Sequence, residues 1–267
     1  MARQARIHRL PMSGPSDVSS IEALVASGDI APDTIVAILG KTEGNGCVND
    51  FTRGYAVQSL RAALSGHLPT DRIDAIPMVM SGGTEGGLSP HWIVLSVDET
   101  EDATDTPSLA IASAITRPLS PSEIGRNAQG GLVRDAVLAA MASAGITRPE
   151  DVHFVQIKCP LLTSERIDGV GGDVATRDTL KSMGLSRGAS ALGVAQALGE
   201  VGEVPDTAIG SDWSLWSSRA SASAGIELMS CEIVVMGQSA DWSGDLAIAH
   251  TVMRDAIDAP SVAAILH

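Results

Sequence analysis

The sequence is poor in aromatic side chains, in cysteine and in positive charge. Aromatic residues make up 3% of its 267 residues, and the formal net charge at pH 7 is −14. Binding to nucleic-acid phosphates requires a basic face on the protein, so this charge argues against nucleic acid as a partner. The excess of acidic residues is instead explained by their contribution to solubility. No apolar run approaches the ~20 residues of a transmembrane helix, so we expect no membrane partner.

The three cysteines are Cys47, Cys159 and Cys231, and no two of them have the spacing of a metal site. An odd number of cysteines without such spacing is typical of reduced thiols in a cytoplasm. Residues 1–6 are basic, but no apolar segment follows them, so we predict no signal peptide. These observations predict a cytoplasmic protein.

Short apolar runs alternate with segments of helical character. Apolar residues make up 44% of the chain, and a globular chain of this length can hold one to three domains. The runs predict strands at 34–39, 76–80, 92–97, 109–112, 152–157 and 232–236. Capping and periodicity predict helices at about 18–28, 51–64 and 122–144, and another that begins at Arg187. The sequence therefore predicts an α/β (or α+β) fold.

The same order of features occurs twice along the chain. A strand that ends in lysine is followed by a helix headed by arginine, then by the motif Ser-small-Gly-x-Glu, then by another strand. The copies are Lys41 and Lys158, Arg53 and Arg187, Ser81 and Ser223, and Glu85 and Glu227. Residues 246–249 then repeat the sequence of residues 109–112. We therefore predict an internal repeat with a first unit at 1–105, a second at 106–243 and the start of a truncated third unit at 244–267.

Lysine is rare, and its positions are informative. The only lysines are Lys41, Lys158 and Lys181, and the first two end apolar strands at matching places in the repeat. A lysine among apolar neighbours is a candidate for a lowered pKa, because desolvation and nearby cations disfavour its charged form. The alternative is a structural salt bridge, and the spacing alone does not decide between the two.

Ser81 and Ser223 stand in loops of small residues, which let the backbone approach a ligand and present N–H groups to it. A serine nucleophile requires a base, and its tetrahedral intermediate requires such donors. Arg53 and Arg187 could hold a carbonyl or carboxylate, although a surface role is the more common one for arginine.

Several familiar motifs are absent. Position 35 is Ile where a phosphate loop ending at Lys41 would need glycine, and there is no Gly-x-Ser-x-Gly elbow. Neither His-Glu-x-x-His nor Cys-x-x-Cys occurs, and the six histidines form no cluster in the sequence. The sequence therefore points to no metal or organic cofactor.

Four segments, at residues 40–50, 80–86, 154–163 and 221–227, resemble the cyanuric acid hydrolase/barbiturase family. The resemblance extends from about residue 7 to the end of the chain. It implies three related α/β units around a pseudo-threefold axis, with sheets forming a central barrel-like core and helices outside. It also implies a homotetramer.

The resemblance further implies roles for the repeated residues. Lys158 would be the general base that activates Ser223 for attack on a ring carbonyl. Substrate oxygens would be held by Arg53, Ser81, Gly82, Arg187, Ser223 and Ala224. Supporting roles would fall to Lys41, Glu85 and Glu227. Ring opening of cyanuric acid would give carboxybiuret, then biuret and carbon dioxide, without a metal or organic cofactor.

The chain departs from the family in length. Family members continue for about another unit, so we expect the third lysine, arginine and serine, and the region that carries a structural divalent metal, to lie outside these 267 residues. Two alternatives remain open. One is a barbiturase that acts on barbituric acid, and the other is an inactive binding or assembly fragment of the family.

Overall fold

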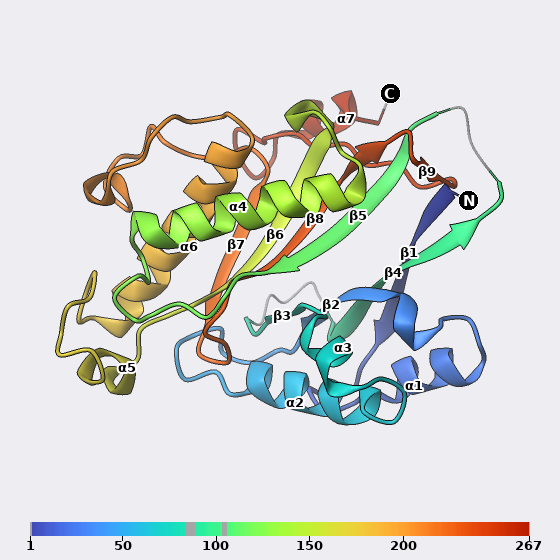
Figure 1. Cartoon of the computed structure of the whole chain (residues 1–267), viewed down its shortest axis with the longest axis horizontal. Coiled ribbons are helices and arrows are strands. Elements are labelled where there is room, and N and C mark those ends of the chain that lie inside the picture. The colour runs from blue at the N-terminus through green and yellow to red at the C-terminus, as the bar shows by residue number, and fades with distance from the viewer. Residues whose placement is uncertain (1, 84–88, 103–105, 267) are drawn as a thin grey trace.

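The structure is a computed structural model that describes residues 2–83, 89–102 and 106–266 (Figure 1). In these ranges the chain forms two β-sheets with helices packed against them. The strands are β1 (Ala2–Pro11), β2 (Ile35–Lys41), β3 (Met78–Ser81), β4 (His91–Thr100), β5 (Ser108–Ile115), β6 (Val152–Pro160), β7 (Ala220–Gly225), β8 (Glu232–Ser239) and β9 (Trp242–Ser243). The α-helices are α1 (Ser19–Ala26), α2 (Thr52–Leu64), α3 (Thr70–Asp74), α4 (Asn127–Ala144), α5 (Ser164–Asp168), α6 (Thr179–Ala197) and α7 (Ala259–Ala264). Short 3₁₀ turns occur at Pro32–Thr34, Pro149–Asp151 and Asp206–Ala208.

The two sheets are built alike. The first has the strand order β3-β2-β4-β1-β9 and the second the order β5-β8-β6-β7. In the first, β2 runs parallel to β3 and antiparallel to β4, which is antiparallel to β1. In the second, β6 runs parallel to β7 and antiparallel to β8, which is antiparallel to β5. Apart from β9, the order and direction of the strands are therefore the same in both sheets.

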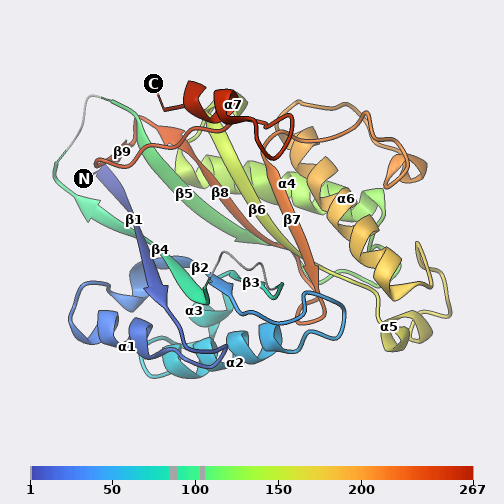
Figure 2. The ribbon, with the colours of Figure 1, turned by 180° about the vertical axis from the view of Figure 1, so that it is seen from behind.

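The sheets contact each other through side chains. The Ser113 hydroxyl of β5 donates to the Val36 carbonyl of β2 at 2.8 Å, and the Glu232 carboxylate of β8 accepts from the Met78 N–H of β3 at 2.8 Å. Ala37 and Leu95 of the first sheet lie in the same apolar cluster as most of the second sheet. One strand crosses from one half of the chain to the other: β9 follows β8 in the chain but pairs with β1 of the first sheet (Figure 2).

The barrel-like core that the resemblance implies is not found. Within the described ranges no hydrogen-bonded ladder joins β5, β6, β7 or β8 to the first sheet. The facing strands meet by side-chain packing and by side-chain to backbone hydrogen bonds, and this leaves two separate mixed sheets instead of one closed sheet.

Helices cover each sheet on the side away from the other (Figures 1 and 2). Against the first sheet, Ile21 of α1, Leu60 of α2 and Ile73 of α3 pack on Ile38 and Trp92. Residues alternate between the two faces of a strand, so Leu39 and Lys41 on β2 point to the opposite side, toward the second sheet. The alternation thus separates a helix-covered core from a face that is available for a site.

Against the second sheet, α4 and α6 pack closely on each other. A Cβ added at Gly193 of α6 would lie 2.4 Å from the Gly130 carbonyl oxygen of α4. The two glycines therefore allow the backbones to approach more closely than larger residues would. Helix α4 ends at Gly145, which has a positive φ of 68° and takes the left-handed cap conformation that glycine accommodates without strain.

One predicted helix begins elsewhere, and one sequence repeat is not matched by a repeated structure. The helix expected to begin at Arg187 begins at Thr179, because the Asp178 side chain accepts the backbone N–H of Lys181 at 3.0 Å and caps it. Residues 246–249 repeat the sequence of β5 residues 109–112 but form no strand; the segment is irregular, and the Leu246 carbonyl accepts a backbone hydrogen bond from the Leu109 N–H. The other predicted helices and strands are present within a few residues of their predicted ends.

Candidate active site

Each repeated lysine lies directly beside its repeated serine. In the parallel pair β2–β3, Lys41 is the register partner of Ser81, and in the parallel pair β6–β7, Lys158 is the register partner of Ser223. Register partners on neighbouring strands direct their side chains to the same face of a sheet. Ser81 ends β3 and Ser223 lies within β7. The sequence had predicted loops at both serines, and this prediction is wrong.

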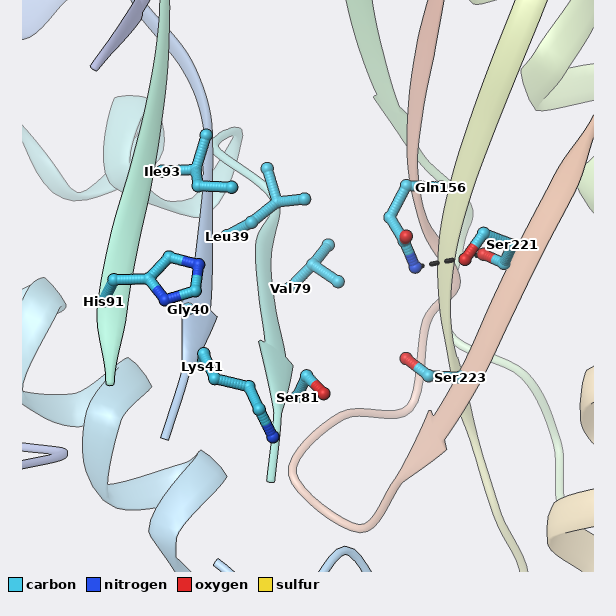
Figure 3. A pocket seen from close by; sticks show the side chains of 10 residues that line it. All are labelled: Leu39, Gly40, Lys41, Val79, Ser81, His91, Ile93, Gln156, Ser221 and Ser223. Atoms are coloured by element: carbon cyan, nitrogen blue, oxygen red, sulfur yellow. Dashed lines mark hydrogen bonds between the residues drawn. The ribbon is translucent and has the colours of Figure 1, made fainter. Parts of the chain in front are cut away.

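A cavity of about 280 Å³ lies between the two sheets (Figure 3). Lys41, Ser81 and His91 come from the first sheet, and Gln156, Ser221 and Ser223 from the second. Leu39, Gly40, Val79 and Ile93 complete the lining. Polar groups thus stand on both walls, and the wall of the first sheet adds apolar side chains from the same strands, which suits a small, rigid molecule with several hydrogen-bonding groups.

Lys158 lies deeper and is not among the lining residues. Its side chain is 1% exposed, and Nζ donates to the Met80 carbonyl at 2.7 Å and lies 3.2 Å from Oε1 of Glu227. Burial lowers the pKa of Lys158 and the nearby Arg53 adds to this effect, while the Glu227 carboxylate opposes it. In the described part of the chain Nζ makes no hydrogen bond to Ser223. Lys158 therefore combines the two alternatives that the sequence left open: its pKa is lowered, and it also forms a salt bridge.

Arg53 occupies the first turn of α2, as predicted, and is buried. Its side chain is 3% exposed, its Nε lies 3.4 Å from Oε2 of Glu227, and a terminal nitrogen donates to the Cys47 carbonyl at 3.0 Å. Asp50, which accepts the backbone N–H groups of Gly46 and Thr52, lies beside the same guanidinium. The arginine is therefore held in place by the loop that precedes its own helix.

The structure accounts for two of the small residues in the serine motifs. A Cβ at Gly82 would lie 1.8 Å from a carboxylate oxygen of Asp50, so this position has no room for a side chain. Ala224 follows Ser223 on β7 and therefore points to the other face, where it belongs to the apolar core of the second sheet. Neither residue is among those that line the cavity, and their roles in substrate binding stay predictions.

Arg187 is not among the residues that line the cavity. Arg187 lies in the third turn of α6, is exposed, and donates from Nε to the Met183 carbonyl of its own helix at 3.2 Å. Its predicted contact with substrate is not tested. Glu85 falls outside the described residues, and its predicted supporting role also stays a prediction.

Sequence reasoning missed three polar residues of this region. Gln156 and Ser221 line the cavity, and Gln156 donates to the Ser221 carbonyl at 3.0 Å. Glu232 is the cross-strand partner of Lys158, and burial raises its pKa to about 7. A signal was present for all three, since Gln156 and Ser221 stand two residues before Lys158 and Ser223, and Glu232 begins an otherwise apolar strand.

Among the residues that the structure describes, no group of three or more His, Cys, Asp or Glu side chains is placed to hold a metal ion. Within the same ranges none of the helices has the length and apolar character needed to cross a bilayer.

Two α/β layers enclosing a small polar cavity, with a buried lysine beside a serine, are typical of an enzyme that acts on a small molecule. Comparison with known proteins makes the class more specific. Residues 6–267 match the family model described as amidohydrolase ring-opening protein. The chain belongs to this family of ring-opening amidohydrolases.

Close relatives match almost the whole chain. A cyanuric acid amidohydrolase of Azorhizobium caulinodans is 57% identical over 267 residues, which are 98% of this chain and 75% of the relative. One from Ectopseudomonas oleovorans is 53% identical, covering 97% of this chain and 74% of the relative. The crystal structure of the cyanuric acid hydrolase from A. caulinodans superposes with a TM-score of 0.94 at 56% identity, over 99% of this chain and 75% of that chain. The chain thus spans about three quarters of the length of these relatives.

Proposed function

We propose that this protein hydrolyses cyanuric acid, opening its ring to carboxybiuret, which then yields biuret and carbon dioxide. The observation that carries the proposal is the pairing of Lys158 with Ser223 on adjacent strands, at a cavity of about 280 Å³ with polar groups on both walls. The names of the relatives, with 57% and 53% identity across nearly the whole chain, support the choice of substrate.

The ring is opened in the first half of the reaction. Lys158, in its neutral form, takes the proton of the Ser223 hydroxyl while Oγ forms a bond to a ring carbonyl carbon. The tetrahedral oxyanion is stabilised by nearby cations and N–H groups. Its collapse breaks the ring C–N bond, and the Lys158 ammonium returns the proton to the leaving nitrogen. The burial that lowers the pKa of Lys158 favours this role, because a base works best when its pKa is near the working pH.

Water completes the reaction. Lys158 takes a proton from a water molecule whose oxygen attacks the acyl carbon, and the bond to Oγ of Ser223 breaks as Oγ regains a proton. The product carries a carboxyl group on nitrogen, and loss of carbon dioxide from it gives biuret. No step of this scheme requires a metal or organic cofactor.

The remaining predicted residues are assigned to binding and support. Ser81 lies on the cavity wall opposite Ser223, and its hydroxyl would donate to a second substrate carbonyl or accept from a substrate N–H (Figure 3). Lys41 provides positive charge on the same wall, and Arg53 and Arg187 are proposed to hold substrate oxygens. A flat ring with three carbonyls and three N–H groups can use several such contacts at once.

We extend the proposal to the organisation of the whole protein. The matching strand orders of the two sheets support two repeat units, at 1–105 and 106–243, with a third beginning at 244. A pseudo-threefold arrangement of such units, a homotetrameric assembly and a cytoplasmic location are also proposed. A structural divalent metal would belong to a third unit.

Product analysis tests the proposed function. The purified chain is incubated with cyanuric acid or with barbituric acid, and biuret and the ring-opened ureide of malonic acid are quantified by mass spectrometry. Biuret as the main product confirms the proposal, and preferential turnover of barbituric acid contradicts it in favour of a barbiturase. Calorimetric titration with cyanuric acid completes the test, because binding without turnover identifies a binding fragment.

A further inference from the structure

Glu227 connects two buried cations that come from different halves of the chain. It lies in the loop between β7 and β8, and its side chain is 6% exposed. Its Oε1 is 3.2 Å from Nζ of Lys158 on β6, and its Oε2 is 3.4 Å from Nε of Arg53 on α2. One carboxylate thus stands between the proposed general base and a proposed substrate-binding arginine.

The surroundings hold this carboxylate in place. A Cβ at Gly225 would lie 2.1 Å from Oε2 of Glu227, so the carboxylate folds back over the backbone where the missing side chain of glycine leaves room for it. Arg166 donates to the backbone carbonyls of Ile226 and Leu228 at 2.8 Å and 3.3 Å, one on each side of Glu227. The loop is therefore fixed at both neighbours of the glutamate, which limits the positions its carboxylate can take.

The charges around Lys158 come from several elements. Glu227 and Arg53 act on it from the β7–β8 loop and from α2, the Cys159 thiol lies next to it on β6, and Glu232 faces it from β8. Arg166 acts on Glu227 from α5. Of the groups that act on Lys158, Glu227 is the carboxylate in direct contact with its amine.

We propose that Glu227 is a positioning residue that fixes the Lys158 amine beside the strand that carries Ser223 and couples the charge of this amine to Arg53. The consequence for catalysis rests on the proposed function. When Lys158 takes the serine proton, the new ammonium forms beside a fixed carboxylate, which stabilises it. Arg53 competes for the same carboxylate, so a change at the substrate-binding arginine alters the proton affinity of the base.

The scarcity of lysine gives a direct test that needs no activity. Protein labelled with ¹³C at lysine Cε gives three signals, from Lys41, Lys158 and Lys181, and Lys158→Arg assigns the relevant one. In Glu227→Gln we expect the pKa of Lys158 to fall, because the carboxylate that favours the ammonium is gone. In Arg53→Gln we expect it to rise, because a competing cation is gone. Glu200→Gln, which removes a carboxylate that pairs with Arg219 instead, should leave it unchanged.

The opposite signs of the two shifts distinguish coupling from damage to the fold, which would move the titration in one direction or broaden it. An unchanged Lys158 titration in Glu227→Gln overturns the proposal. If that variant does not fold, Arg53→Gln decides alone, and an unchanged or lowered pKa of Lys158 there overturns it.

Kinetics supply the catalytic readout. The acidic limb of the kcat profile, which reports the protonation of the base, should move to lower pH in Glu227→Gln, while the maximal kcat falls by up to about 100-fold because the amine is misplaced. Glu227→Asp keeps the charge and should restore the position of the limb. A wild-type chain that does not turn over cyanuric acid would contradict the proposed function but leave the NMR test of Glu227 intact.

Discussion

At the scale of single residues, the site combines local pairing with long-range contacts. The lysine–serine pairs follow from neighbouring strands in register, whereas the contacts of Lys158 with the Met80 carbonyl and with Arg53, through Glu227, bring together the two halves of the chain. The chemistry of the buried amine therefore depends on residues far from it in sequence.

The two serines should differ in the effect of their removal. Ser223→Ala and Lys158→Ala should each lower kcat by at least about 1,000-fold, because they remove the nucleophile and its base. Ser81→Ala should keep measurable turnover with a raised KM, because it removes only a binding contact. Steady-state kinetics with cyanuric acid measure both effects. A covalent adduct trapped on Ser81, detected by peptide mass spectrometry, would reverse the two assignments.

Glu232 should make the stability of the protein depend on pH. Burial raises its pKa from 4.5 to about 7, so the folded state binds this proton more tightly than the unfolded state does. This stabilising contribution is fully present below pH 4.5 and is lost as the pH rises through about 7. The stability lost is roughly 3 kcal/mol, because each unit of pKa difference between the folded and unfolded states is worth about 1.4 kcal/mol. Urea unfolding between pH 4.5 and 8.5 should show this loss in the wild type but not in Glu232→Gln. The exposed Glu22→Gln serves as the control and should retain the wild-type dependence.

At the scale of secondary-structure elements, the close approach of α4 and α6 places the second helix layer on its sheet. Gly193→Ala should lower the free energy of unfolding by about 1–3 kcal/mol, because the added methyl would lie 2.4 Å from the Gly130 carbonyl oxygen and 3.0 Å from Cβ of Val133. Gly184→Ala in the same helix is the matched control. Nothing lies within 4 Å of its Cβ, so it should leave stability unchanged or raise it by up to about 1 kcal/mol. Equal effects of the two substitutions on urea unfolding would contradict this account.

The sequence predicted those elements whose signal is local. Short apolar runs predicted β2, β6 and β8, and the lysine at the end of each unit's second strand was visible because lysine is so rare. The strand β1 was missed because polar and charged residues interrupt its apolar residues throughout, and only Ala5 is buried within it. The start of α6 was missed because its cap, Asp178, stands nine residues before Arg187, where the run of small residues resembled a helix start.

The site was predicted less completely than the elements. The pairing of Lys158 with Ser223 was implied by the family resemblance, but the contact of Lys158 with Glu227 was not predicted, nor was the absence of Arg187 from the cavity lining. Both depend on how the loops and helices pack around two facing sheets, and spacing in the sequence carries no information on that packing.

At the scale of the whole molecule, the two halves share one apolar core and should unfold together. Leu95 of the first sheet is fully buried in the cluster that contains Ile111 and Ile233 of the second, so its contacts belong to both halves. Leu95→Ala should lower the free energy of unfolding by about 2–5 kcal/mol. It should also shift the urea transitions measured by far-UV circular dichroism and by tryptophan fluorescence by the same amount.

The buried tryptophans make this test sensitive to both halves, since Trp92 packs under the first helix layer and Trp242 lies in the shared core. Two separate transitions, with only one of them shifted by Leu95→Ala, would show that the halves fold independently and that the cavity between them forms only after each has folded.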